Sequence, residues 1–169
     1  MKRISKKLAI LFCIGIIAVT TSCKKDKNPE NSWKVGDKSY KQAYGVIEGG
    51  EDRTSYRLTA ADASFRNVLM VIFKSEPTAG TYEIVAAGES SLEAGEVIVT
   101  TAEGMDTADR MDAGAKSEGK SATVEIVGGK LKVTIPKVNA YYVPHGEALL
   151  TAERFTTIEG SIIETENPF

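Results

Sequence analysis

The chain has 169 residues, a formal net charge of −2 and 26% charged residues. A weakly acidic chain of this size lacks the clustered Lys and Arg of nucleic-acid-binding proteins, so we exclude a nucleic-acid partner. Its single histidine excludes metal sites built from two or three histidines, and we find no motif for a cofactor or for catalysis.

The first 22 residues have the three parts of a secretory signal. A positively charged start is followed by an apolar run over 8–19 and by a short exit of small residues, Thr20-Thr21-Ser22. The apolar run is shorter than the ~20 residues that a membrane-spanning helix needs. We therefore predict that residues 1–22 are a signal peptide.

Cys23 follows this segment directly. The small residue before it resembles the signal of bacterial lipoproteins, in which the Cys becomes the acylated first residue of the mature protein. Thr20 stands where the usual lipobox has an aliphatic residue, and this form is similar to the looser lipoboxes of Bacteroidota. Cys13 would be removed with the signal, so Cys23 would be the only mature cysteine, and acylation accounts for a lone exported thiol. The resemblance implies an outer-membrane lipoprotein carrying palmitate or similar chains at Cys23, on a membrane face that the sequence leaves open.

The remaining chain divides into a tether and one domain. Residues 23–31 are polar apart from Cys23 and Pro29 and cannot pack into a core, so we interpret them as a linker between lipid and domain. Residues 32–169 fit the length of a single domain. Loss of the four basic residues of the signal takes the net charge from −2 to −6. No internal disulfide would be available, so folding would rest on core burial.

The first half of this domain predicts short strands separated by turns. Trp33 and Val35 alternate with polar residues before a Gly36-Asp37 turn, which indicates a first hairpin. The continuous apolar run within 66–74 predicts a central strand that is buried on both faces. Further strands are predicted near 44–47, 55–59, 82–85 and 96–101, and a short helical turn near 60–64.

The clearest local signal is a hairpin over 122–127 and 130–135. Gly128-Gly129 permits positive φ at both positions of a two-residue turn. That turn sets Ile126 opposite Leu131, with Val124 opposite Val133, and it places the aliphatic residues on one buried face. Pro136 is expected to end the ladder or to mark an edge, and 138–143 and 154–164 are expected to form the last strands.

This pattern gives about eight to ten short strands with turns roughly every ten residues. It predicts an all-β fold, an antiparallel β-sandwich or small barrel. The segment 102–113 is interpreted as a loop rather than a helix.

Two groups of polar residues are candidate sites. His145 could act as a base with Glu147, but the pattern favours a loop histidine without a chemical role. Carboxylates near 103–112 could gather around calcium, with Asp106, Asp109 and Asp112 as the candidate ligands. Their spacing does not match a calcium-binding loop, so a solvated acidic loop is the favoured interpretation.

The aromatic residues are the remaining candidates for binding. Trp33, Tyr141 and Tyr142 are the candidate contacts for a sugar or a partner, against the alternative that they fill the core. Adjacent residues on a strand face opposite ways, so one of Tyr141 and Tyr142 is expected to lie outside.

Several segments together are similar to the small β-rich outer-membrane lipoproteins of Bacteroidota whose domain has no known function. They are Cys23 with its signal, Trp-Lys-Val-Gly (33–36), Gly-Thr-Tyr-Glu-Ile (80–84), Gly-Lys-Leu-Lys-Val-Thr-Ile-Pro (129–136) and Ile-Glu-Gly-Ser-Ile (158–162). The resemblance implies a lipid-anchored, non-catalytic binding or assembly module of the cell envelope, with a glycan, a small molecule or an envelope protein as partner. The alternatives are a hydrolase with two carboxylates in a cleft, an enzyme inhibitor acting through the loop 102–118, and a barrel that carries a small ligand.

Overall fold

The computed structural model describes residues 31–49, 55–88, 91–151 and 153–165, and over these ranges the fold is all-β. The predicted signal peptide, most of the tether and Cys23 lie outside the described residues. Within them no helix has both the length and the apolar character needed to cross a membrane. Their strands are β1 (Ser32–Val35), β2 (Lys38–Lys41), β3 (Tyr44–Glu48), β4 (Tyr56–Ala61), β5 (Asn67–Phe73), β6 (Gly80–Val85), β7 (Glu96–Glu103), β8 (Met111–Ala115), β9 (Ser121–Val127), β10 (Lys130–Pro144) and β11 (Phe155–Ile163), with a 3₁₀ helix η1 (Leu149–Thr151).

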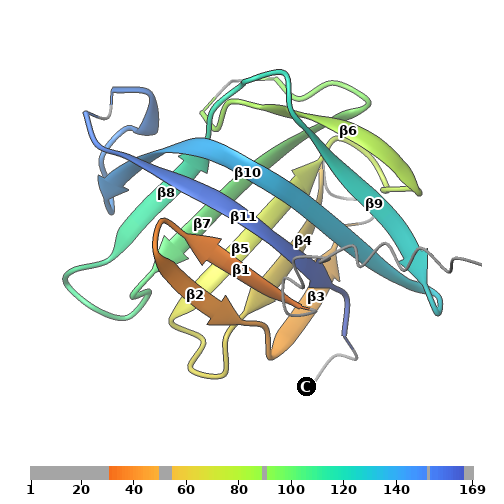
Figure 1. Ribbon diagram of the computed structural model, residues 1–169, viewed down its shortest axis with the longest axis horizontal. Helices are drawn as coiled ribbons and strands as arrows, with labels where there is room; N and C mark the ends of the chain where they lie inside the picture. The colour runs from red at the N-terminus through yellow and green to blue at the C-terminus, as the bar shows by residue number, and fades with distance from the viewer. Residues whose placement is uncertain (1–30, 50–54, 89–90, 152, 166–169) are drawn as a thin grey trace, which may run out of the picture.

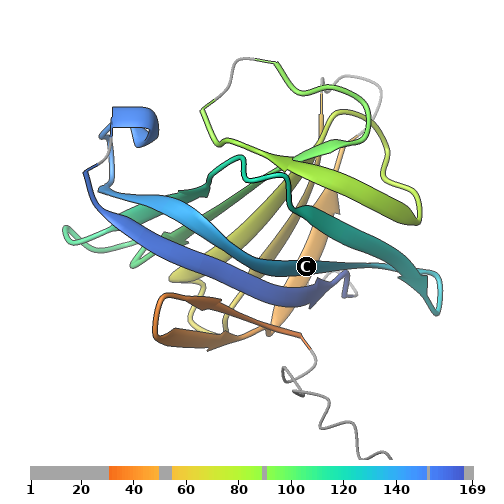
Figure 2. The same ribbon diagram turned by 45° about the horizontal axis from the view of Figure 1, so that its top comes forward.

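These strands form one sheet that curls back on itself (Figures 1 and 2). The order is β2-β1-β11-β10-β9-β6-β7-β5-β4-β3, and β8 pairs with both β10 and β7, which closes a hydrogen-bonded circuit. Beyond β11 the chain also meets β3, because the Thr165 N–H donates to the Gly45 carbonyl over 2.7 Å. The Gln42 side chain adds a second link, accepting from the Ile163 N–H at 3.0 Å. The predicted all-β fold is confirmed, and its closure is like that of a small barrel.

One pair of strands departs from the antiparallel expectation. β6 and β7 run parallel, with Glu83 beside Glu96 and Val85 beside Ile98. Parallel neighbours require a crossover connection rather than a tight turn, and residues 86–95 supply it. The sheet is therefore mixed.

The interior is filled by the inward-facing residues of these strands. β5 lies between β4 and β7, as expected for the central strand. Its inward residues Leu69, Val71 and Phe73 are buried, while its outward residues Met70 and Ile72 are half-buried. The prediction that this strand is buried on both faces is therefore wrong at these two outward positions. The largest side chains of the core are Trp33, Phe73, Leu58, Leu69, Ile84, Ile135, Ile158 and Ile162.

The hairpin of β9 and β10 has the predicted register. Ile126 pairs with Leu131, and Gly128 and Gly129 have φ values of 60° and 79°. Ile126 nevertheless is 53% exposed, because this end of the hairpin extends beyond the core.

Pro136 does not end β10, which continues to Pro144. The ladder with β9 stops at Thr134, and β8 becomes the neighbour from Ala140 onward. Between them, the register with β11 shifts between Ile135 and Val138. A bulge tolerates a residue without an N–H, so the strand passes through the proline and changes partner.

Candidate functional site

A groove lies on the outer face of β3, β4 and β5. Its volume is about 490 Å³, and side chains from these strands and from two loops line it. The lining residues are Tyr44, Val46, Glu48, Arg57, Thr59, Ala61, Phe65, Val68, Met70, Met105 and Arg110. The lining is thus mostly apolar, with three charged residues.

An aromatic pair forms one end of the groove. The rings of Tyr44 and Phe65 stack with centroids 4.3 Å apart and planes 17° apart. Phe65 lies in the turn between β4 and β5 with φ at 58°, an uncommon backbone state for a bulky residue. Its ring is nevertheless 43% exposed, so the turn places an aromatic surface where a ligand can reach it.

Hydrogen bonds around Asp62 hold this turn in place. The Asp62 carboxylate accepts from the Asn67 side-chain amide at 2.8 Å and from the Ser64 hydroxyl at 2.9 Å. Although partial burial opposes the change, hydrogen bonds from Asn67 and Ser64 lower the pKa of Asp62 below its usual value. The Phe65 N–H donates to the Asp62 carbonyl at 3.1 Å, which fixes the backbone at the strained residue.

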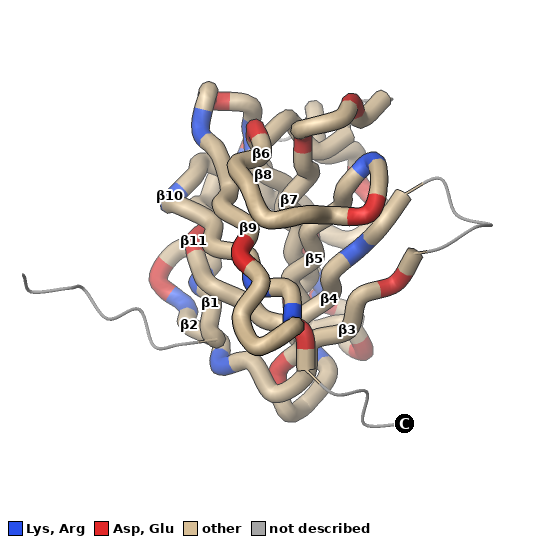
Figure 3. The backbone as a smooth tube through the Cα atoms, turned by 90° about the vertical axis from the view of Figure 1, so that its right-hand side faces the viewer, with Lys and Arg blue, Asp and Glu red and all other residues tan. Residues whose placement is uncertain are grey.

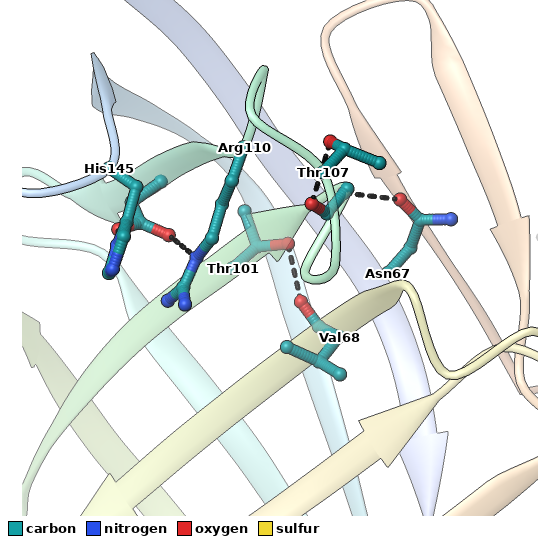
Figure 4. Close-up of polar contacts among 8 residues, drawn as sticks. Asn67, Val68, Thr101, Thr107, Arg110 and His145 are labelled. Atoms are coloured by element: carbon teal, nitrogen blue, oxygen red, sulfur yellow. Dashed lines mark hydrogen bonds and ion pairs between the residues drawn. The ribbon is translucent and has the colours of Figure 1, made fainter.

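The loop 104–110 lines a second side of the groove through Met105 and Arg110. The Gly104 N–H donates to the Asn67 side-chain oxygen at 3.3 Å, and the Thr107 hydroxyl donates to the Gly104 carbonyl at 2.9 Å (Figure 4). The Met105 N–H donates to the Arg66 carbonyl at 2.9 Å. These bonds place the 37%-exposed side chain of Met105 beside the turn that carries Phe65.

The charged residues of the groove differ in their partners. Arg110 pairs with Asp112, with its Nε 3.0 Å from a carboxylate oxygen (Figure 4). Arg57 lies on β4 opposite Glu48 of β3 and lines the other end of the groove. Elsewhere on the described part of the chain, charges of both signs are interspersed along the backbone (Figure 3).

The predicted calcium ligands do not form a site. Asp106 and Asp109 are exposed in the loop, while Asp112 lies on β8 and contacts Arg110 and His145. The described residues contain no group of three or more His, Cys, Asp or Glu side chains arranged to hold a metal ion. The three candidate carboxylates are therefore not gathered at one point, because Asp112 lies on β8 and faces Arg110 and His145 while the other two are exposed in the loop.

His145 contacts the carboxylate of Asp112 and not that of Glu147, the partner considered from the sequence. Its Nδ1 lies 2.7 Å from an Asp112 oxygen, and the ring is 56% exposed. Its backbone N–H donates to the Arg110 carbonyl at 2.9 Å. The histidine thus fixes the start of β8 next to the groove.

A buried carboxylate, Glu103, was not singled out by the sequence. Its side chain is 7% exposed and accepts from the hydroxyls of Tyr40 and Tyr142, the latter at 2.7 Å. The Lys38 Nζ approaches the same carboxylate at 3.3 Å. Both carboxylate oxygens are engaged, so this cluster fastens the β1–β2 hairpin to β7 and β10.

The three aromatic candidates occupy different environments. Trp33 is fully buried in the core and stacks on Tyr40 with centroids 5.5 Å apart, so it presents no binding surface. Tyr142 faces inward to Glu103. Tyr141 faces outward beside Phe155, with ring centroids 6.0 Å apart, as expected for adjacent residues on one strand. The Lys116 ammonium lies over both of these outer rings, which makes a small aromatic patch away from the groove.

The Glu103 cluster makes alkaline stability depend on Tyr142. Burial, followed by the hydrogen bond and negative charge of Glu103, raises the pKa of Tyr142 to about 12 from 10.0. The same effects raise the pKa of Tyr40. Because the unfolded chain releases these protons first, the contribution to stability is complete below about pH 10 and is lost as pH rises through about 12.

We therefore expect the free energy of unfolding to fall more steeply with pH in the wild type than in Tyr142→Phe between pH ~10 and ~12. Urea unfolding at a series of pH values measures this slope. Tyr141→Phe is the matched control, because the hydroxyl that contacts Glu103 belongs to Tyr142 and not to Tyr141. Equal slopes for wild type and Tyr142→Phe would contradict the role given to this hydrogen bond.

Comparison of the chain with protein-family models, with curated proteins and with solved structures returns no match.

Proposed function

We propose that the chain is a lipid-anchored, non-catalytic binding module of the bacterial cell envelope that holds the apolar part of a small ligand in its outer groove. The observation that carries this proposal is the preformed groove with its stacked and exposed Tyr44–Phe65 pair. Its volume of about 490 Å³ falls within the range of ~300–1,000 Å³ that is usual for small-molecule sites.

The packing of the core favours an outer site over an inner one. Trp33, Phe73 and a set of aliphatic side chains fill the space between the strands and are fully buried. A carrier barrel of this size would need smaller inward residues or a wider circuit to hold a ligand. We therefore propose that a small ligand binds on the outer face of the sheet and not inside the barrel.

The backbone at Phe65 supports a binding role for the groove. A bulky residue with positive φ costs free energy, and such strain is retained where the surrounding structure requires it. Here the strained turn holds an aromatic ring that is 43% exposed at the groove. A ligand that covers the ring would remove this apolar surface from water.

The distribution of carboxylates supports binding rather than hydrolysis. Glycoside hydrolysis uses two carboxyl groups facing each other across the substrate. Glu48 is the one carboxylate among the described residues that line the groove. The buried Glu103 accepts hydrogen bonds at both oxygens from protein donors and lies on the inner face.

The envelope location is proposed from the signal and from Cys23. The first strand begins at Ser32, nine residues after Cys23. An extended chain spans at most ~3.3–3.6 Å per residue, so the domain would remain within ~30 Å of a lipid at Cys23. A ligand bound in the groove would thus be held close to the membrane.

Binding of a neutral apolar dye, N-phenylnaphthylamine, tests the groove. We expect the folded protein to enhance its fluorescence with saturation at one dye per chain. Phe65→Ala is expected to weaken this binding about tenfold, because loss of one aromatic contact is worth ~1.4 kcal/mol. Met105→Ala is expected to act in the same direction.

Phe155→Ala is the matched control for this experiment. Phe155 is 59% exposed, more than Phe65, but it belongs to the patch with Tyr141 and Lys116. Dye binding should not change in this variant. Binding that ignores Phe65→Ala, or that is lost equally in both variants, would overturn the proposal.

A further inference from the structure

We infer that the ligand of the groove is an elongated amphiphile whose carboxylate or similar anionic group pairs with Arg57, at the end opposite the Tyr44–Phe65 pair. This inference rests on the proposed function of the groove and names the class of ligand that it takes. It is carried by the order of side chains along β4 and by the partners of the two arginines in the lining.

The groove changes from apolar to charged along one strand. Ala61, Thr59 and Arg57 are the outward residues of β4, and all three line the groove. In the β3–β4 ladder, Ala61 lies opposite Tyr44, whereas Arg57 lies opposite Glu48. Four residues of strand span ~13 Å, which is the length of a phenyl ring carrying a short alkyl chain.

The apolar end suits a flat or aliphatic group. Tyr44 and Phe65 supply aromatic faces, and the flexible side chains of Met70 and Met105 adapt to the shape that they meet. Val68 and Ala61 belong to a small buried cluster beneath them. This end offers no charged group except Arg110, which Asp112 already neutralises.

Of the two arginines that line the groove, Arg57 is the one available to pair with a ligand. Within the described residues its guanidinium makes no ion pair or side-chain hydrogen bond, in contrast to Arg110. An apolar body lying along the groove would remove water from this guanidinium, and an unpaired desolvated charge is costly. A ligand that brings a carboxylate to this position avoids the cost, because the planar guanidinium binds carboxylate through two hydrogen bonds.

A pair of probes that differ only in charge tests the inference. Phenylhexanoate and phenylhexanamide have the same ring and chain, and isothermal titration gives their affinities. We expect the carboxylate to bind about tenfold more tightly than the amide. Arg57→Gln should remove this preference by lowering the affinity for the carboxylate to about that for the amide, and Arg57→Lys should retain part of it.

Arg66→Gln is the matched control, because Arg66 is exposed on the β4–β5 turn and does not line the groove. It should keep the preference for the carboxylate. High salt should reduce the preference in the wild type, since it screens an exposed charge pair.

The outcomes separate this inference from the proposed function. Equal affinities for the two probes, or a preference that survives Arg57→Gln, would overturn the anionic ligand while leaving the apolar site in place. Failure of both probes, together with dye binding that ignores Phe65→Ala, would overturn the groove itself.

Discussion

Cys23→Ala is expected to abolish the incorporation of labelled palmitate into the protein in cells. The proposed anchor depends on one sulfur atom, because the acyl chains would be attached to Cys23. The residues that follow it as far as Asn31 contribute no apolar side chain except Pro29. Each buried CH₂ of an acyl chain contributes ~0.8 kcal/mol of membrane affinity, and stable anchoring takes more than one such signal. Loss of the thiol would therefore remove nearly all the affinity of the mature chain for lipid.

Cys13→Ala is the matched control for this experiment. Cys13 is the other cysteine of the chain and lies in the apolar part of the predicted signal, which processing would remove. Palmitate labelling and globomycin-sensitive processing should persist in this variant. Labelled and membrane-bound Cys23→Ala protein would show that the lipid is attached elsewhere or that the anchor is of another kind.

Local sequence signals predicted the hairpins correctly. The Gly128-Gly129 turn fixes the register of β9 and β10 through two residues that accept positive φ. The Gly36-Asp37 turn does the same for β1 and β2, where Val35 pairs with Lys38. In each case the information lies within a few residues, so no knowledge of distant partners is needed.

Local sequence signals could not predict the parallel pairing of β6 and β7, nor the change of partner strand of β10 at Pro136. β6 and β7 are joined by a crossover, and their pairing depends on the strands that flank them, β9 and β5. β10 pairs with β9 before Pro136 and with β8 after it, which is a consequence of barrel closure. Such long-range pairing leaves no pattern in the local sequence.

The alternation of buried residues along β7 indicates that Glu103 is also buried. Val97, Val99 and Thr101 alternate along β7, and all are buried. Continuing this period of two places Glu103 on the same inward face. Its position before an acidic loop suggested a solvated side chain instead, whereas its hydrogen bonds come from Tyr40 and Tyr142, both distant in sequence.

The groove was also missed because its walls come from separate turns. Tyr44, Phe65 and Met105 belong to no sequence motif that marks them as binding residues. Their positions depend on the strained turn after β4 and on the loop 104–110, which are held together through Asn67. Only the folded sheet brings these two loops to the same face.

Trp33→Ala is expected to lower the free energy of unfolding by ~3–5 kcal/mol, the usual cost of truncating a buried tryptophan. Trp33 is fully buried, and its neighbour on β11 is Gly160. A Cβ added at Gly160 would lie 2.7 Å from the Trp33 Cα, so the two strands leave no room for a larger residue there. The variant would therefore lose tight contacts that no neighbouring side chain can restore.

Trp33→Ala would mainly weaken the attachment of the β1–β2 hairpin to the rest of the sheet. β1 is held by its ladder with β11, by the stacking of Trp33 on Tyr40 and by the Glu103 cluster. Without the indole, Tyr40, which donates a hydrogen bond to Glu103, loses its stacking partner. A domain with a total stability of ~5–15 kcal/mol would then be close to unfolding.

Urea unfolding followed by circular dichroism measures this change, because the variant contains no tryptophan for fluorescence. Phe155→Ala is the control, and its cost should be below ~1 kcal/mol because that ring is 59% exposed. Trp33→Phe should cost less than Trp33→Ala, since it keeps a ring and removes an indole N–H that has no partner among the described residues. If Trp33→Ala and Phe155→Ala had equal effects, Trp33 would not be the residue that fastens the hairpin to the barrel.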